Sequence, residues 1–246
     1  MSATDTAAER RIWVLKSHDA PWHEWLTGFV RPGMQVVEIG ANNGEDTVIL
    51  ANLVGPRGRV VAFEPDPENL QRLRTRITTA GLQDRVCSLE VAVADVAGPA
   101  TLYRSEHATQ HALVEDNLCD SDRCGTVPIA QVTLDGMLEH LELAGPVGFV
   151  KCDAQGYEGK VLRGATRLLA QGPVWLLEIW PYGLAHAGSS AREVWTTMRD
   201  AGYVACGMDK LTRQPQPCAE DVFFGIVAER ELGLRRHFDA VFLPEC

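Results

Sequence analysis

The residues V-V-E-I-G-A-N-N-G at positions 36–44 constrain the fold of this chain more than any other segment. They form a short apolar strand pattern that runs directly into a turn containing Gly40 and Gly44. A second apolar run, V-V-A-F at 60–63, follows and ends on the carboxylate of Glu64. Apolar strands that alternate with helices are typical of an open α/β sheet, whose ligands bind outside the carboxyl ends of the strands. The sequence therefore predicts a ligand crevice between the first turn and Glu64.

The residues at these two strand ends favour a nucleoside that carries positive charge. Gly40 and Gly44, with Asn42 between them, would let the backbone come close to a ligand. Glu64 stands where a carboxylate can accept hydrogen bonds from both hydroxyls of a ribose. A dinucleotide fold would show G-x-G-x-x-G at the first turn to hold a pyrophosphate, but here the turn is G-A-N-N-G and Glu38 lies just before it. The turn therefore favours S-adenosylmethionine, which is cationic at its sulfonium and amino groups, over NAD.

The charge balance of the chain argues against several classes of partner. The 246 residues include 23 Lys and Arg against 33 Asp and Glu, a formal net charge of −10. Nonspecific binding to nucleic acid or to an anionic membrane needs basic surface, so we expect neither partner. The sequence shows no apolar run of bilayer length, no signal-peptide pattern at its start, and seven cysteines without a disulfide framework. We expect a cytoplasmic protein that acts on a small molecule, and a homodimer is compatible with this expectation.

Strand and helix patterns alternate along most of the chain. Beyond the two strands above, strands are expected near 86–93, 127–132, 148–153, 174–180, 203–208 and, as the last strand, 222–228. A β-hairpin arm is expected at 100–103 after Gly98-Pro99, and the polar, irregular residues 104–126 have the length of a functional or mobile loop. The alternation predicts an α/β fold with a single doubly wound, mostly parallel sheet. We expect an N-terminal helical and aromatic extension over 1–30 and one domain over 31–246.

Three blocks of the sequence resemble the FkbM family of S-adenosylmethionine-dependent methyltransferases. They are V-V-E-I-G-A-N-N-G-E-D-T at 36–47, V-A-F-E-P-D-P-E-N-L at 61–70 and V-K-C-D-A-Q-G-Y-E-G-K-V-L-R-G-A at 150–165. The first two blocks are similar to class I methyltransferases in general. The third matches a K-x-D-x-x-G-x-E-x-x-V-L-x-G-A pattern that is typical of the FkbM family. Cys152 and Gln155 depart from the family pattern.

The resemblance implies a seven-stranded Rossmann-like sheet with its last strand antiparallel. It also implies methyl transfer from S-adenosylmethionine, most often to a hydroxyl of a natural product or sugar. We assign Glu38 to the methionine end of the cofactor and Glu64 to the ribose, and from the topology we expect Ala92 and Val93 beside the adenine. The residues expected to give close backbone approach are Gly40, Asn42 and Gly44.

Three carboxylates are candidate catalytic residues. Asp153, at the end of the strand near 148–153, either positions the acceptor, acts as a general base or binds a metal, or it simply caps the following helix. Glu158 is either a site residue or a first-turn carboxylate that complements the helix dipole. Glu178 lies inside an apolar strand, where a buried carboxylate costs free energy unless it is paired. It is therefore a second site candidate or a structural carboxylate bound by backbone amides.

Two histidines in the irregular loop are further candidates. Either His107 or His111 could serve as a general base, because an imidazole titrates near neutral pH, and a solvated loop histidine is the alternative. Together with Cys119 and Cys124 they could also bind zinc. The C-x4-C spacing has no second C-x-x-C or H-x3-H to support that interpretation, so we expect no metal.

These patterns predict an S-adenosylmethionine-dependent O-methyltransferase that acts on a hydroxyl of a small natural product or sugar-like acceptor. One alternative keeps the cofactor and moves the methyl group to a nitrogen or a carboxylate. Another is a noncatalytic, nucleoside-binding subunit.

Overall fold

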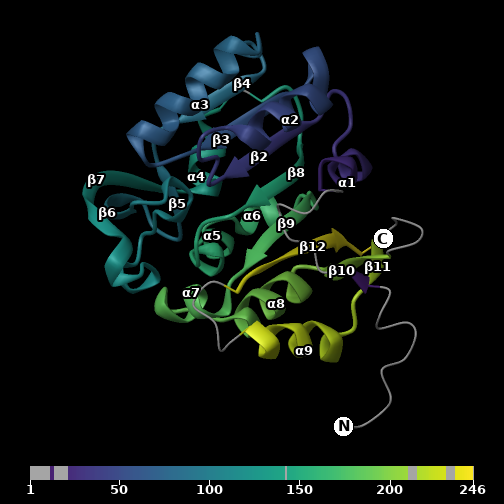
Figure 1. The fold of residues 1–246 in the computed structure, drawn as a ribbon. Helices are drawn as coiled ribbons and strands as arrows, with labels where there is room; N and C mark the ends of the chain where they lie inside the picture. Colours follow the sequence, from purple (N-terminus) through teal and green to yellow (C-terminus); the bar gives the residue numbers. More distant parts are fainter. Residues whose placement is uncertain (1–11, 14–21, 142, 210–214, 231–235, 246) are drawn as a thin grey trace.

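The computed structural model describes residues 12–13, 22–141, 143–209, 215–230 and 236–245 (Figure 1). In the predicted N-terminal extension it contains strand β1 (Ile12–Trp13) and helix α1 (Trp22–Phe29). The rest of residues 1–21 falls outside the described residues. Across the described ranges, no helix has the length and apolar character that a bilayer crossing requires.

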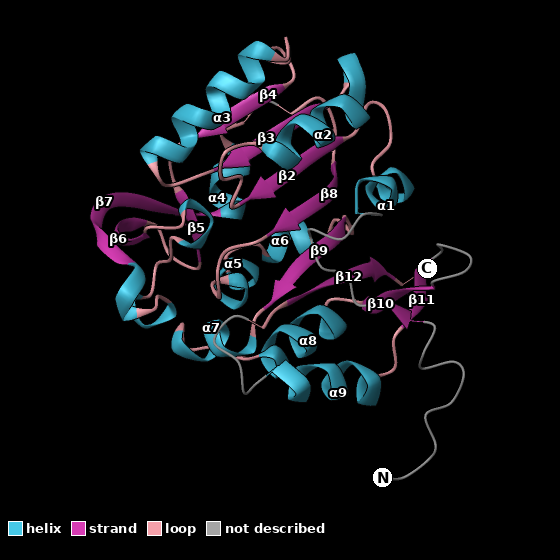
Figure 2. Ribbon diagram, viewed as in Figure 1, coloured by secondary structure: helices cyan, strands magenta, loops and turns pink. Residues whose placement is uncertain are grey.

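A nine-stranded, mostly parallel sheet forms the centre of the described chain (Figure 2). Its order is β1-β10-β12-β9-β8-β2-β3-β4, with β11 paired to β10. The strands after β1 are β2 (Gln35–Ile39), β3 (Arg59–Phe63), β4 (Val86–Leu89), β8 (Val147–Cys152), β9 (Val174–Ile179), β10 (Tyr203–Asp209), β11 (Pro215–Pro217) and β12 (Phe238–Pro244). The prediction of seven strands is wrong in number, because the short β1 and β11 both pair with β10 and extend the sheet.

The strand order reverses between β2 and β8. Strand β2 pairs in parallel with β3 on one side and with β8 on the other. In an open α/β sheet this reversal opens a crevice outside the carboxyl ends of the strands. Gly40, Glu64 and Asp153 directly follow β2, β3 and β8, so all three lie at this edge.

Each face of the sheet carries its own apolar core, because side chains alternate along the strands. Val36 and Val60 face one cluster, formed with helices α1, α2 (Glu45–Val54) and α3 (Pro67–Thr79). Val37 and Val61, one residue further along each strand, face the other cluster. The helices of that second face are α4 (Leu134–Glu139), α5 (Glu158–Arg163), α6 (Thr166–Leu169), α8 (Ala191–Asp200) and α9 (Glu220–Arg230). Helices on both faces confirm the doubly wound arrangement.

A second, three-stranded sheet lies beyond the carboxyl ends of the central strands (Figure 1). It consists of β5 (Ala92–Ala94), β6 (Gly98–Ser105) and β7 (Arg123–Thr133) in the order β5-β7-β6. The predicted arm at 100–103 is confirmed within β6, which pairs antiparallel with β7. The predicted strand at 86–93 is wrong as a single element, because β4 joins the central sheet and β5 joins this one.

The predicted last strand at 222–228 is wrong. This segment lies within helix α9, and the last strand is β12, antiparallel to β9. Phe223 and Val227, one helical turn apart, are buried against the core, whereas the intervening residues are less buried. A short apolar run fits either element, and here the burial follows the helical period.

Candidate functional site

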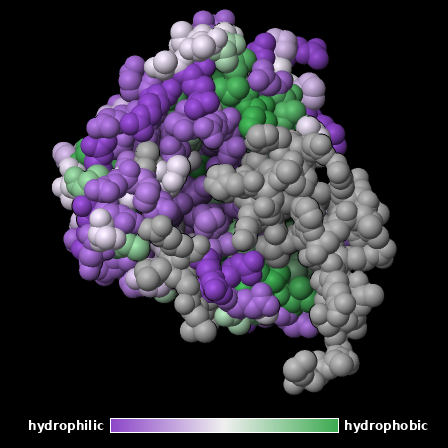
Figure 3. Space-filling view, in the orientation of Figure 1, coloured by the Kyte–Doolittle hydropathy of each residue, from purple (hydrophilic) through white to green (hydrophobic). Residues whose placement is uncertain are grey.

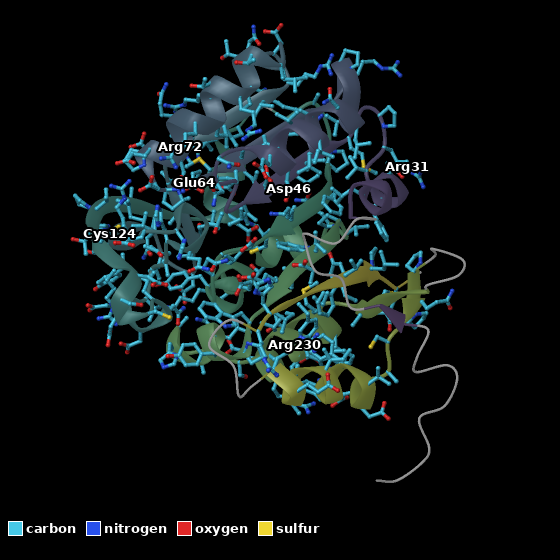
Figure 4. The ribbon with its side chains drawn as sticks, viewed as in Figure 1. Arg31, Asp46, Glu64, Arg72, Cys124 and Arg230 are labelled. Atoms are coloured by element: carbon cyan, nitrogen blue, oxygen red, sulfur yellow. The ribbon has the colours of Figure 1, made fainter. Side chains whose placement is uncertain are left out.

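One large cavity lies along the carboxyl edge of the central sheet. Its volume is about 1400 Å³, above the roughly 300–1,000 Å³ of a pocket for one small ligand, so it has room for a nucleoside and an acceptor together. Figure 4 labels three lining residues, Asp46 at the start of α2, Glu64 after β3 and Arg72 on α3. Further lining residues come from α2 and α3 and from the loops at the carboxyl ends of the strands, and they include 38–43, 91–93, 109–113, 153–155, 117, 119, 151, 178, 180 and 237.

The turn after β2 is shaped by contacts within the protein. Gly40 has φ +76, and a Cβ at this position would lie 1.9 Å from the carbonyl oxygen of Asp153. Gly44 has φ +83, and its Cβ would meet the side chain of Leu73 on α3 at 2.9 Å. Gly40 lines the cavity, but Gly44 does not. The expected reason for Gly44, close approach to a ligand, is therefore wrong, because its missing side chain makes room for α3.

Glu64 joins the ends of β2 and β3. Its Oε2 accepts a hydrogen bond from the backbone N–H of Asn42 at 2.7 Å, and its Oε1 accepts one from Asp66 at 2.9 Å. Asn42 adopts the left-handed region, with φ +50, and lines the cavity beside Glu64. Burial raises the pKa of Glu64 to about 7. Each carboxylate oxygen has a second lone pair, so Glu64 can hold the turn and still accept a ligand hydroxyl.

Glu38 is a fully buried carboxylate inside β2 that also lines the cavity. Its Oε2 accepts a hydrogen bond from the Thr47 hydroxyl at 2.6 Å, but its Oε1 has no hydrogen-bond partner among the described residues. Burial raises the pKa of Glu38 to about 8, even though Lys151 acts in the opposite direction. A buried acceptor without a partner costs free energy that a cationic or hydrogen-bonding ligand would recover.

The apolar side of the cavity comes from the start of the small sheet. Ala92 and Val93 on β5 are both buried and line the cavity, as the expected neighbours of an adenine should. The outer face of the molecule over α3 and over β6 and β7 is mainly hydrophilic (Figure 3).

Lys151 is a buried cation on the floor of the cavity. Its Nζ lies 3.3 Å from Asp46 Oδ2 and 3.9 Å from Asp153 Oδ2. Burial lowers the pKa of Lys151, but the two carboxylates outweigh this and hold the pKa above its usual value. Lys151 therefore stays charged and links the first turn of α2 to the end of β8.

Asp153 and Glu178 come together at the other end of the cavity. Gln155 Nε2 donates to Asp153 Oδ1 at 2.8 Å and to Glu178 Oε2 at 3.2 Å. The helix-cap alternative for Asp153 is wrong, because α5 begins at Glu158 and Tyr157 precedes it. Burial, with Asp153 nearby, raises the pKa of Glu178 well above its usual range.

Glu158 does not line the cavity. It is fully buried, and its Oε1 accepts hydrogen bonds from the backbone N–H groups of Ala154 at 2.7 Å and Gly156 at 3.4 Å. Burial raises the pKa of Glu158 to about 8. This placement does not support the predicted catalytic role, because the carboxylate binds backbone N–H groups of the loop after β8 and does not reach the cavity.

The two predicted loop histidines occupy different environments. His111 lines the cavity, and its Nδ1 accepts a hydrogen bond from the Ser105 backbone N–H at 3.1 Å. Its neutral ring therefore carries the proton on Nε2, which lies 3.8 Å from Asp66 Oδ2. Burial lowers the pKa of His111. This geometry disfavours His111 as a base, and His107 is exposed and outside the cavity lining.

The zinc alternative gains no support from the placement of its ligands. Cys124, labelled in Figure 4, is exposed on β7 of the small sheet and does not line the cavity. Within the described ranges, no three His, Cys, Asp or Glu side chains form a metal-binding group.

The irregular segment between β6 and β7 is fixed against the site. The Asn117 side-chain amide donates to the carbonyl oxygens of Gln155 at 2.9 Å and Gly183 at 3.3 Å. The Tyr182 hydroxyl, on helix α7 (Pro181–His186), donates to the carbonyl of Asp116 at 3.2 Å. The segment therefore forms one wall of the cavity.

His237 is a lining residue that sequence reasoning missed. It immediately precedes β12, and its Nδ1 lies 3.6 Å from Glu178 Oε1. An antiparallel last strand begins at the edge where the parallel strands end, so the correct position of β12 would have placed His237 at the crevice. The prediction of a strand at 222–228 hid this signal.

Comparison with protein families gives one match over most of the chain. The profile of the Methyltransferase FkbM domain matches residues 38–205. The matched region contains the turn after β2, the end of β3 and the loop after β8.

Two curated proteins are similar to parts of the chain. One is a catechol O-methyltransferase from Mycobacterium tuberculosis, 36% identical over 100 residues, which are 41% of this chain and 41% of that protein. The other is a protein-L-isoaspartate O-methyltransferase from Ignicoccus hospitalis, 38% identical over 52 residues, which are 21% of this chain and 25% of that protein. The chain therefore aligns with less than half of the length of either relative.

Among solved structures, cofactor-bound Rv0187 from MTB superimposes with a TM-score of 0.51 at 20% sequence identity. The superposition covers 96% of this chain and 84% of that one. At this identity the similarity shows a shared fold.

Proposed function

The chain belongs to the FkbM family of S-adenosylmethionine-dependent methyltransferases, and we propose that it methylates a hydroxyl of a small natural product or sugar-like acceptor. The observation that supports this proposal is one cavity that is lined by two pairs of carboxylates. We assign Glu38 and Glu64 to the nucleoside end, and Asp153 and Glu178 to the acceptor end. A hydroxyl acceptor needs groups that accept its hydrogen bond while its proton leaves. The carboxylates of Asp153 and Glu178 can accept such a hydrogen bond.

The described residues fit S-adenosylmethionine at the first end. The buried Glu38 Oε1 without a partner is an acceptor for the cationic methionine end. Glu64 presents a carboxylate for the ribose hydroxyls, and Ala92 and Val93 form an apolar wall for the adenine. When bound, the cofactor supplies a methyl carbon activated by the adjacent sulfonium.

The second end is built to orient an acceptor. The side chain of Asp153 is 30% exposed and is held by Lys151 and by the hydrogen bond from Gln155. It can accept a hydrogen bond from the acceptor hydroxyl, while Trp180 adds an apolar wall. Positioning of this kind supplies much of the rate of a displacement reaction. The partial similarity to a catechol O-methyltransferase supports an oxygen acceptor.

The proposal is tested by following a labelled methyl group into products. The purified protein is incubated with methyl-labelled S-adenosylmethionine and a panel of hydroxyl compounds that includes catechol and methyl glycosides. We expect a methyl ether, identified by mass spectrometry and stable to mild base. Because Asp153 would position the acceptor, Asp153→Asn should reduce the rate by about 100-fold and leave S-adenosylhomocysteine binding intact, whereas the exposed Asp200→Asn should match the wild type.

Other results would point to other functions. A base-labile methyl ester or an N-methyl product would replace the hydroxyl with a carboxylate or a nitrogen acceptor. Binding of S-adenosylhomocysteine without turnover across the panel would favour a noncatalytic, nucleoside-binding subunit. Each of these outcomes contradicts the hydroxyl proposal.

A further inference from the structure

His237 and Glu178 meet at the acceptor end of the cavity because of the topology. Strand β12 runs antiparallel to β9, and Phe238 is the register partner of Ile179. In this register Glu178 lies opposite Asp239, and His237 lies two positions away along the strand. His237 and Glu178 are therefore diagonal neighbours on one face of the sheet, with Nδ1 3.6 Å from Oε1. Both side chains line the cavity.

Glu178 is fixed from its other side. Its Oε2 accepts the hydrogen bond from Gln155 Nε2, and the same amide nitrogen donates to Asp153. Gln155 has φ +51, a left-handed backbone conformation of the kind found at functional sites. With Oε2 occupied by Gln155, Oε1 is the oxygen that faces the imidazole of His237.

We propose that His237 is the general base of the reaction and that Glu178 positions its ring. The inference rests on the proposed function, since only a hydroxyl acceptor must lose a proton to a base. In this proposal the neutral ring carries its proton on Nδ1, which lies 3.6 Å from Glu178 Oε1, and Nε2 is then the basic nitrogen. As the acceptor oxygen bonds to the methyl carbon, its proton moves to Nε2, and the electron pair of the broken carbon–sulfur bond stays on sulfur. The imidazolium then lies beside the Glu178 carboxylate, which stabilises it.

Charged groups from five elements surround this pair. Glu178 belongs to β9 and Asp153 follows β8, while Glu158 on α5 and Asp239 on β12 also act on the charge of Glu178. Arg230 of α9 donates from Nε to the His237 carbonyl at 3.4 Å. Because burial raises the pKa of Glu178, its negative charge is held best when His237 is positive.

Asp153 is less suited to be the base. Its carboxylate already accepts the Gln155 hydrogen bond and lies 3.9 Å from the charged Lys151. Both carboxylate oxygens therefore already have partners inside the protein. It is better placed to orient the acceptor.

The test compares His237→Gln with His140→Gln, a matched change at an exposed histidine outside the cavity lining. With the hydroxyl acceptor that the wild type methylates, we expect His237→Gln to lower kcat by about 10²–10⁴-fold and to lose the acidic limb of the pH–rate profile. S-adenosylhomocysteine binding, measured by calorimetry, should remain within about threefold. Nitrogen NMR of labelled histidine gives a readout that needs no turnover: the neutral His237 ring should carry its proton on Nδ1, and Glu178→Gln should remove this preference.

Two results would overturn the base assignment. One is a His237→Gln variant that keeps kcat and the pH profile of the wild type, and the other is a wild-type ring protonated on Nε2. Failure of the proposed function looks different, because the wild type itself would then bind S-adenosylhomocysteine and form no methyl ether.

Discussion

Gly40 and Asp153 pack backbone to backbone, so closely that a Cβ on Gly40 would lie 1.9 Å from the Asp153 carbonyl oxygen. Asp153 also donates its backbone N–H to the carbonyl of Ile39 at 3.0 Å. These contacts join the turn after β2, which we propose faces the nucleoside, to Asp153, which we propose faces the acceptor. The distance between the two ends of the cavity is therefore set by the pairing of β2 with β8.

Gly40→Ala should destabilise the protein by about 2–5 kcal/mol, because left-handed strain adds to a backbone clash. Gly81→Ala is the matched control, since Gly81 has φ +66 and open space around its missing Cβ. The control should lose only about 1–2 kcal/mol from strain alone. Urea unfolding measures both values. Equal losses in the two variants would show that the contact with Asp153 is not what requires glycine.

Thr47→Val should destabilise the protein by about 1–3 kcal/mol, because it removes a hydrogen bond to the buried carboxylate of Glu38 while keeping the shape of the side chain. It should also weaken S-adenosylhomocysteine binding, since the lost hydrogen bond fixes Glu38 within the cavity. Thr78→Val makes the same change at an exposed position of α3 and should stay within about 0.5 kcal/mol. Urea unfolding measures the stability of both variants, and calorimetry on the same samples measures the binding of S-adenosylhomocysteine. A Thr47→Val protein as stable as the control would contradict the hydrogen bond assigned to Glu38.

Glu158→Gln should change how stability depends on pH. Burial raises the pKa of Glu158 from 4.5 to about 8, so between these values the folded protein holds a proton that the unfolded chain releases. This contribution to stability is present at low pH and is lost as the pH rises. Removing the group should make the slope of unfolding free energy less negative, by up to about 1.4 kcal/mol per pH unit between about pH 5 and 7.5.

The control for this titration is Glu139→Gln, which changes an exposed carboxylate. Its slope should equal that of the wild type. If Glu158→Gln gave that same slope, Glu158 would not bind its proton more tightly in the folded state.

The central sheet was predictable because its strands carry unambiguous patterns. The apolar run that ends at Ile39 is followed by a turn with glycines, and the run that ends at Phe63 is followed by a capped helix. The predictions of both strands are confirmed. The segment 222–228 was not, because a short apolar run fits a strand or a helix and only its packing against the core decides. Strand β12 then went unrecognised, along with the residue before it.

The site was predictable where the strand ends define it. Glu38, Glu64, Asp153 and Glu178 all line the cavity, as their positions indicated. The sequence could not show that Glu158 differs from these four carboxylates. Whether a buried carboxylate points into the cavity or toward a loop backbone depends on the folded conformation of that loop. The two loop histidines could not be told apart from the sequence either. Only the structure shows that a backbone N–H donates to Nδ1 of His111, which disfavours this histidine as a base.

The most direct test of the cofactor end is calorimetric titration of S-adenosylhomocysteine into the wild type and Glu64→Ala, with Glu68→Ala as control for a carboxylate outside the cavity lining. Circular dichroism confirms that each variant is folded. We expect tight binding to the wild type and the control, and a 10- to 100-fold loss in Glu64→Ala, roughly 1.4–2.8 kcal/mol. No binding to the wild type, or equal binding to a folded Glu64→Ala, would contradict this assignment of the cavity.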